Sequence, residues 1–187
     1  MRAFIALPLP EQVRGPLAAL QHQLDEAGAD VKWVAPDQLH VTLKFLGEIP
    51  PPDAAAVETL LRSVAAQTPS FALSAGAVGA FPSLRAPRVI WVGLTAGRER
   101  AIGLAQAIEA SGTAVPGWVR EERPFAAHIT LGRVRSPRGR DALAAQMAKA
   151  VWEAPLPWLV ERMTLYQSVL GAGGSQYTPL AEIPLRA

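Results

Sequence analysis

Short apolar runs alternate along the chain with stretches whose apolar positions recur at helical spacing. The runs predict strands at residues 3–7, 31–34, 40–46, 71–78, 89–94, 128–134 and 163–170, with a weaker one at 177–183. Apolar spacings of three and four predict helices marked by Val13, Leu17, Leu20 and Leu24, by Val57, Leu60, Leu61 and Val64, by Ile102, Ala105 and Ile108, and by Leu143, Met147 and Ala150. Asp53 follows three prolines and is a candidate cap for the second helix.

The two halves of the chain repeat one order of elements. Each predicts a strand, a helix, a short strand, a histidine-bearing strand, a second helix and a final strand. Residues 4–7 are expected to correspond to residues 90–93, since Phe4 precedes His40 by 36 positions and Ile90 precedes His128 by 38. Two copies indicate an internal duplication rather than a solenoid.

This pattern predicts one α+β domain over residues 1–187, with an internal repeat at approximately 1–80 and 88–187. Two pseudo-symmetric lobes are expected, each an antiparallel sheet with helices packed outside. They would face each other across an active-site cleft. The Pro- and Gly-containing stretch 76–88 is the expected crossing point between them.

The motif His-x-Thr-Leu occurs twice, beginning at His40 and at His128. Side chains alternate along a strand, so each histidine should share a face with the threonine two positions on, Thr42 or Thr130. On the same rule Lys44 should lie on the face of His40, and Phe45 on the opposite, buried face. The apolar partners bury against helices, which leaves both His-Thr pairs directed into the space between the lobes.

Two converging imidazoles suit acid–base chemistry. An imidazole with a pKa near 6.5 acts as an acid or a base at neutral pH, and a pair holds both roles at once. Displacement at phosphorus needs one group to take a proton from the attacking water and another, opposite it, to protonate the departing oxygen. Threonine hydroxyls can donate hydrogen bonds to the phosphate oxygens.

Other interpretations of these residues are weaker. One His-x-Thr alone is more commonly a hydrogen-bonded core histidine, but two at equivalent points, in a chain with three histidines, favour catalysis. His22, between Gln21 and Gln23, is expected on a helix surface. Zinc needs three or four ligands, and neither motif contains an acidic residue, so we expect no metal and no other cofactor. No Gly-x-Ser-x-Gly elbow is present to favour a hydroxyl nucleophile.

Composition narrows the class of ligand. The chain has no cysteine, which excludes disulfides and thiolate sites and predicts a cytoplasmic protein. Its apolar runs are too short and broken to predict a transmembrane helix, so no membrane partner is expected, nor an obligate protein partner. The net charge of +2 gives no large basic surface. Six arginines lie between Arg120 and Arg140, and guanidinium groups match phosphate, which favours a nucleotide or RNA ligand unless arginine-rich codon usage explains them.

The motifs resemble those of the 2H phosphoesterase superfamily, in its RNA 2′,3′-cyclic phosphodiesterase branch (LigT-like, also called 2′-5′ RNA ligase). Landmarks in the family's order extend over almost the whole chain, at residues 2–6, 33–48, 88–93, 123–125, 128–133, 165–168 and 177–180. One departure is Ala127, where the family often has proline before the second histidine.

The resemblance implies metal-independent hydrolysis of an RNA 2′,3′-cyclic phosphate end to a 2′-phosphomonoester. It implies His40 as proton donor, His128 as proton acceptor, and Thr42 and Thr130 as ligands of the phosphate. The residues five beyond each histidine, Phe45 and Arg133, are implied to contact substrate, although strict alternation places both on the other face. A bulge or strong twist near Gly132 would be needed to turn Arg133 toward the site.

Two rival functions remain open from the sequence. The same histidines would serve the reverse reaction, joining a cyclic phosphate end to a 5′-hydroxyl in a 2′-5′ linkage, which we expect only as a side activity. A non-catalytic nucleotide-binding module is the alternative from another class. The physiological RNA, whether tRNA fragments or small cyclic nucleotides, is not specified by the sequence, nor are base preference and oligomeric state.

Overall fold

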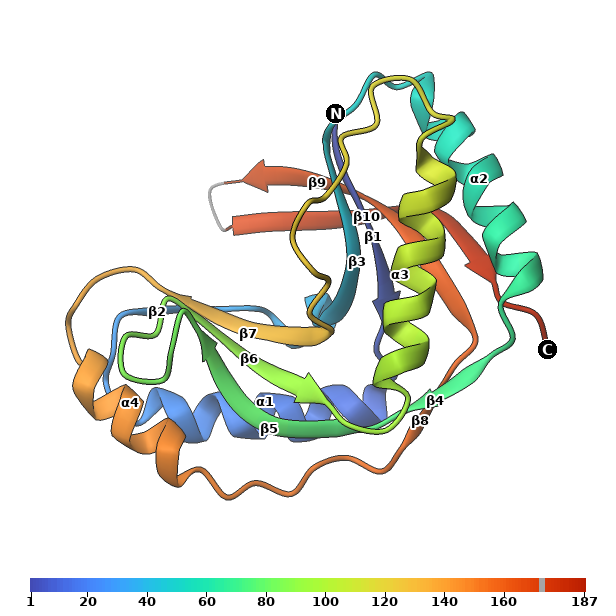
Figure 1. Cartoon of the computed structure of the whole chain (residues 1–187). Coiled ribbons are helices and arrows are strands. Elements are labelled where there is room, and N and C mark those ends of the chain that lie inside the picture. Colours follow the sequence, from blue (N-terminus) through green and yellow to red (C-terminus); the bar gives the residue numbers. More distant parts are fainter. Residues whose placement is uncertain (172–173) are drawn as a thin grey trace.

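Two half-sheets of antiparallel strands, each covered on one face by two helices, form the frame of the protein (Figure 1). The computed structural model describes residues 1–171 and 174–187. Along these residues the elements are β1 (Arg2–Pro8), α1 (Glu11–Asp25), β2 (Val31–Trp33), the 3-10 helix η1 (Pro36–Gln38), β3 (His40–Glu48), α2 (Asp53–Gln67), β4 (Phe71–Leu73), β5 (Ala75–Phe81), β6 (Val89–Leu94), α3 (Arg98–Gly112), β7 (His128–Val134), α4 (Arg140–Lys149), β8 (Trp158–Val160), β9 (Arg162–Gly171) and β10 (Gly174–Pro184). The predicted α+β class with two lobes is confirmed.

A single pair of residues joins the half-sheets. The first has the strand order β10-β9-β1-β3 and the second has β7-β6-β5, with β2 on the edge of β7 that also meets β3. In the described part of the chain, β3 and β7 pair at Val41 and Ile129 alone, and both side chains are 0% exposed. The strands diverge on either side of this pair, and the uncovered faces of the half-sheets border the same space (Figure 1).

Each half-sheet is covered by one helix from each half of the chain. α1 follows β1 but packs on the second half-sheet, where the buried Gln21 amide donates to the carbonyl oxygens of Val34 at 2.8 Å and Leu131 at 2.9 Å. α4 lies beside α1, since Gln146 Nε2 donates to Gln23 O at 2.6 Å. α3 follows β6 but lies against α2 and β3 of the first half-sheet. The lobes are therefore built by exchange of helices between the two halves.

Two three-residue strands carry the chain between the half-sheets. β4 leads from α2 to β5, β8 leads from α4 to β9, and the two pair antiparallel. The predicted crossing at 76–88 is wrong, because these residues form most of β5 and the turn into β6, with Phe81 paired to Val89. The single predicted strand at 71–78 is also wrong. Its backbone leaves one sheet for the other at Ser74, whose N–H donates to Ala96 O and whose carbonyl accepts from Thr95 N.

The expected correspondence of residues 4–7 with 90–93 is off by one position. Ala6 pairs with Thr42 in β3, and Trp91 pairs with Thr130 in β7, so Ala6 is equivalent to Trp91 rather than to Val92. A slip of one residue exchanges the two faces of a strand. Trp91 can thus lie on the histidine face, where the uncorrected correspondence would have buried it.

The predicted apolar stripes of α1 and α2 are buried, whereas Ile102 of α3 is only half-buried and Ala150 lies just beyond the last residue of α4. The predicted stripe of α1 is buried, with Val13, Leu17 and Leu24 at 0% exposure. Asp53 is not the cap of α2: the N-cap is Pro52, without a side-chain hydrogen bond, and Asp53 is the first helical residue. Its carboxylate still lies in the first turn, where the helix dipole favours negative charge. Among the described residues, no helix is long and apolar enough to cross a membrane.

The Gln21 amide joins α1 to the second half-sheet, and this contact leads to a prediction about stability. Gln21→Leu keeps the volume but removes the donor from buried carbonyls, and we expect a loss of about 1–3 kcal/mol in the free energy of unfolding, measured by urea denaturation. Gln12→Leu, at an exposed position of the same helix, is the control and should change stability by less than about 0.5 kcal/mol. Equal effects of the two variants would contradict the fastening role of Gln21.

Candidate active site

The Val41–Ile129 pair brings both His-x-Thr motifs to one place. Because the paired side chains are buried under the helices, the residues on either side of each point to the uncovered face. His40 and Thr42 from β3 thereby lie beside His128 and Thr130 from β7, and all four side chains are partly exposed. The predicted convergence of these four residues is what the backbone register produces.

His40 is fixed by hydrogen bonds at both ring nitrogens. Nδ1 lies 2.7 Å from the carbonyl oxygen of Gln38, the last residue of η1. Because a carbonyl only accepts, Nδ1 carries the hydrogen, and in the neutral ring Nε2 is the basic atom. Nε2 then accepts from the Thr42 hydroxyl at 2.9 Å. The ring is thereby held at both nitrogens, with Nε2 beside the Thr42 hydroxyl.

His128 is held by the same device. Its Nδ1 donates to the carbonyl oxygen of Ala126, two residues earlier, at 2.6 Å. The equivalent spacing from Gln38 to His40 shows that both repeats fix the imidazole by a local backbone carbonyl. In each ring Nε2 is therefore the atom available for proton transfer.

Both imidazoles favour the neutral form in the free protein. Burial is the largest effect on the pKa of His40 and lowers it; the hydrogen bond to Gln38 opposes this, and the neighbouring His128 lowers it further. Burial likewise lowers the pKa of His128, the hydrogen bond to Ala126 raises it, and the Arg133 guanidinium lowers it. Two cationic rings so close together would repel, so the site disfavours double protonation.

Each histidine lies against its own group of aromatic rings. Phe4 and Tyr177 lie 5.0 and 5.5 Å from the His40 ring, measured between centroids, and Tyr166 stacks on Phe4 at 5.2 Å. Phe81 and Trp91 lie 5.2 and 6.2 Å from the His128 ring. The sequence patterns assigned none of these five a role, although the landmark stretches contain four of them, because residues far apart in the chain meet here only through the sheet order.

A β-bulge at the same point of each repeat decides where Phe45 and Arg133 lie. The register of β3 on β1 shifts between Thr42 and Lys44, and that of β7 on β6 shifts between Thr130 and Gly132. The shift near Gly132 is the one that a contact of Arg133 with substrate requires. Both Phe45, at 62% exposure, and Arg133 are consequently exposed on the histidine side, and the Phe45 ring lies 6.2 Å from Phe4. The expectation from strict alternation that Phe45 is buried is wrong.

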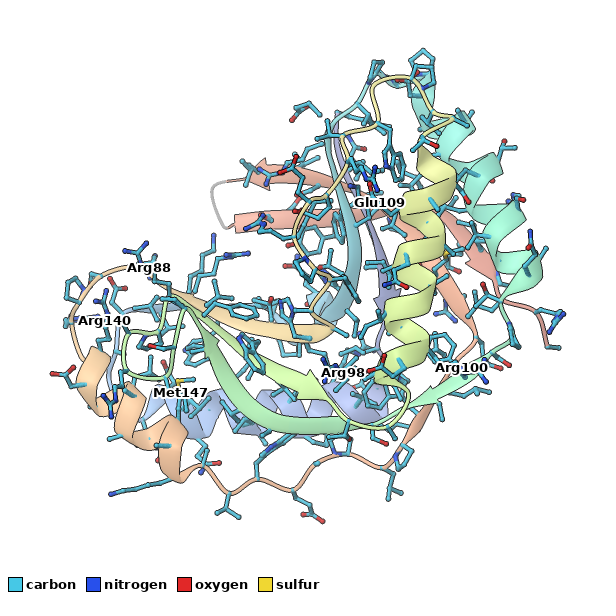
Figure 2. The ribbon with its side chains drawn as sticks, viewed as in Figure 1. Arg88, Arg98, Arg100, Glu109, Arg140 and Met147 are labelled. Atoms are coloured by element: carbon cyan, nitrogen blue, oxygen red, sulfur yellow. The ribbon has the colours of Figure 1, made fainter. Side chains whose placement is uncertain are left out.

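The prediction that Lys44 shares the face of His40 is wrong for the same reason. Its side chain is 7% exposed and turns toward α3, where Nζ lies 2.7 Å from Glu109 Oε2 and donates to Val119 O at 2.6 Å. The Glu109 carboxylate also accepts from Trp118 Nε1 and from the Glu121 backbone N–H, both at 3.2 Å. Figure 2 shows Glu109 on the side of α3 that faces this loop. Residues 113–127, which lead into β7, are thus tied to the first half-sheet.

Glu109 is charged because of these contacts. Burial alone would raise the pKa of its carboxyl, but hydrogen bonds from Lys44, Trp118 and the Glu121 backbone outweigh burial and hold that pKa below its usual value. Among the described residues, no three His, Asp or Glu side chains are gathered closely enough to hold a metal ion. His22 is exposed on α1, as predicted.

Known proteins share this fold and chain length. The family described as LigT like Phosphoesterase matches residues 7–91. The RNA 2′,3′-cyclic phosphodiesterase of Methanothermobacter thermautotrophicus is 32% identical over 180 residues, which cover 96% of each chain. The crystal structure of TT0787 of Thermus thermophilus superposes with a TM-score of 0.80 and 31% identity, over 100% of this chain and 98% of that one. Escherichia coli LigT complexed with 3′-AMP gives a TM-score of 0.77 and 30% identity, over 98% and 97%.

These similarities extend across both half-sheets and both histidine strands, and they define the class of protein as the 2H phosphoesterases. Within it, the chain belongs to the LigT-like phosphoesterase family.

The mutual effect of the histidines predicts a titration result. In His128→Gln, the pKa of His40 should rise, because the variant no longer carries a second positive charge that repels the protonated His40 ring. The His40 ring-proton shift, followed by NMR against pH, measures this directly. His22→Gln is the control and should leave the curve unchanged. If the His40 titration curve is the same in His128→Gln and in the parent, the two rings do not influence each other's pKa and the prediction is wrong.

Glu109 predicts a second pH effect, on stability. A carboxyl with a lowered folded pKa contributes stability that is complete above its unfolded pKa, near 4.5, and is lost as the pH falls through the folded value. Glu109→Gln should cost about 1–3 kcal/mol at neutral pH, because Lys44 stays buried without its counter-charge. The variant should also lose less stability than the parent below pH 4.5. Urea unfolding from neutral to acid pH, with exposed Glu153→Gln as control, checks both; equal acid losses in parent and variant would contradict the role of Glu109.

Proposed function

We propose that the protein hydrolyses the 2′,3′-cyclic phosphate at an RNA end to a 2′-phosphomonoester, using His40 and His128 without a metal. The observation that carries the proposal is the Val41–Ile129 pair, which gathers two tethered imidazoles and two threonine hydroxyls on one uncovered face. Relatives support the substrate class: the Methanothermobacter protein is named an RNA 2′,3′-cyclic phosphodiesterase, and E. coli LigT has been crystallised with 3′-AMP.

Hydrolysis needs one proton taken and one given. In the proposed mechanism, His128 Nε2 takes a proton from a water as its oxygen forms a bond to phosphorus. The bond from phosphorus to the 3′-oxygen breaks, and that oxygen receives the proton held on His40 Nε2. The products are a 2′-phosphomonoester and a free 3′-hydroxyl. Proton exchange with solvent then restores both rings.

Binding of the anionic substrate favours the protonated form of His40, which the free site disfavours. A cyclic phosphate carries one negative charge, and its arrival beside His40 raises the pKa of that ring, opposing the effects of burial and of His128. Protonated Nε2 then becomes a donor. The Thr42 hydroxyl then no longer donates to Nε2 and is free to donate to a phosphate oxygen, which is the role we also assign to Thr130 of β7.

Substrate contacts outside the four central residues come from the bulged positions. Phe45 and Arg133 are exposed on the histidine side, one on each half-sheet. A phenyl ring and a guanidinium both stack on nucleobases, and the guanidinium also neutralises phosphate. We assign Phe45 to the terminal base and Arg133 to a substrate phosphate.

Loss of either imidazole tests the mechanism. His40→Gln and His128→Gln should each lower kcat on a short RNA ending in a 2′,3′-cyclic phosphate by roughly 10²–10⁴-fold, with unchanged thermal stability curves showing that the fold is intact. The parent should show a bell-shaped pH–rate profile and retain its rate in EDTA. Chromatography should identify the product as a 2′-monophosphate.

The exposed His22→Gln variant is the matched control and should retain the full rate. Near-normal turnover in either central variant would remove that residue from the mechanism. A 3′-monophosphate product would show that the other oxygen leaves. Tight uptake of nucleotide without product would favour a binding module, and loss of activity in EDTA would restore the metal interpretation.

A further inference from the structure

Two cations face each other across strands at the edge of the candidate active site. Lys32 of β2 is paired with Arg133 of β7. Its neighbours Val31 and Trp33 turn to the helix face, where the Trp33 Nε1 donates to Asp25 of α1 at 2.7 Å. Lys32 therefore points to the other face, which is the side of Arg133 and the histidines.

The pairing of Lys32 with Arg133 contributes unfavourably to the stability of the fold. Like charges directly opposite one another on neighbouring strands destabilise a sheet. Close by on the same two segments, Arg135 is matched with Asp30, its Nε lying 3.2 Å from Oδ1. Within residues 1–171 and 174–187, by contrast, no carboxylate lies within salt-bridge distance of Lys32 or Arg133. The juxtaposition is suited to an anion that comes from outside the chain.

Lys32 also reaches across to the first half-sheet. A Cβ placed on Gly174, at the start of β10, would lie 2.9 Å from Lys32 Nζ and 3.2 Å from Cε. Gln38 Nε2 donates to the carbonyl oxygen of the next residue, Ser175, at 2.9 Å. The exposed Lys32 side chain thus extends toward the start of β10, so that its ammonium group lies between the two half-sheets.

The position of the pair relative to His128 suits a second phosphate. Arg133 lies five residues beyond His128, a span of about 16 Å along a strand, from which its long side chain can reach back. The guanidinium is close enough to lower the pKa of His128, and Lys32 stands one strand further away. A bidentate fork and a point charge together match the two oxygens and the negative charge of a phosphodiester.

We propose that Lys32, together with Arg133, binds the phosphodiester that precedes the terminal cyclic nucleotide, so that the preferred substrate is an RNA end of two or more nucleotides. This inference rests on the proposed function and adds the substrate class to it. A cyclic mononucleotide has no such phosphate and leaves Lys32 without a partner.

Lys32→Gln, compared on two substrates, tests the assignment. The first substrate is the RNA dinucleotide ApA ending in a 2′,3′-cyclic phosphate, on which we expect KM to rise about 10-fold with kcat unchanged. On adenosine 2′,3′-cyclic monophosphate, both constants should stay at parent values. The salt dependence of kcat/KM on the dinucleotide should weaken, since one phosphate contact is lost. Lys32→Arg should retain the dinucleotide preference.

Lys149→Gln is the matched control, since it removes the same charge from an exposed position on α4 and should alter neither substrate. Lys32→Gln should also be at least as heat-stable as the parent, because a like-charge contact is relieved. An equal loss on both substrates, no loss on either, or a lowered Tm would overturn the assignment.

Binding separates this inference from the proposed function. A dinucleotide ending in a 3′-phosphate should bind the parent more tightly than 3′-AMP, and Lys32→Gln should abolish that difference. If the parent binds both but hydrolyses no cyclic phosphate, the proposed function fails and the binding comparison still decides the role of Lys32. Equal affinities in the parent would overturn the inference whatever the activity.

Discussion

The buried contact between Val41 and Ile129 is the constraint on which the site depends. It is the one strand pair that joins the half-sheets among the described residues, and burial of both side chains fixes which way every neighbouring residue points. A slip by one residue would turn both motifs toward the helices and bring valine and isoleucine into solvent. Burial of this apolar pair on one face of the sheet therefore determines that the histidines and threonines lie on the other face.

The bulges add a second constraint, which acts just beyond the first. In β3 and β7 alike, one extra residue after the threonine reverses the alternation, so that the fourth residue beyond the histidine is buried and the fifth is exposed on the site side. The first repeat uses the buried position for Lys44, which ties the loop before β7 to α3. The second has Gly132 there, and its missing side chain leaves room for Trp33 and Val31. One local irregularity thus yields a fastening in one lobe and close packing in the other.

Sequence patterns predicted the elements and the paired motifs because these follow from periodicity within one segment. The stripe from Val13 to Leu24 and the two His-x-Thr strands are of this kind. The pattern within one segment does not predict which other elements that segment packs against. A buried stripe says that α1 packs on a sheet without saying which one, and a single polar residue on that stripe, Gln21, is what distinguishes the second half-sheet. Strict alternation also failed at Lys44, because a bulge depends on pairing with a distant strand.

Each half of the chain provides one histidine in a nearly equivalent backbone setting, and the side chains around each ring make the two different. Both rings are held by a carbonyl two residues earlier, so the backbone alone does not distinguish donor from acceptor. His40 has Phe4 and Tyr177 around it and bonds to Thr42, whereas His128 has Phe81 and Trp91 and the charge of Arg133 nearby. In the proposed mechanism a nearby fixed cation keeps His128 neutral and ready to accept a proton. Burial lowers the pKa of both rings, but the charge that further lowers the pKa of His40 is that of His128, which is absent while His128 is neutral, so an arriving phosphate favours protonation of His40. In this proposal the backbone places the two rings in equivalent positions, and the fixed charge of Arg133 beside one of them distinguishes the proton acceptor from the donor.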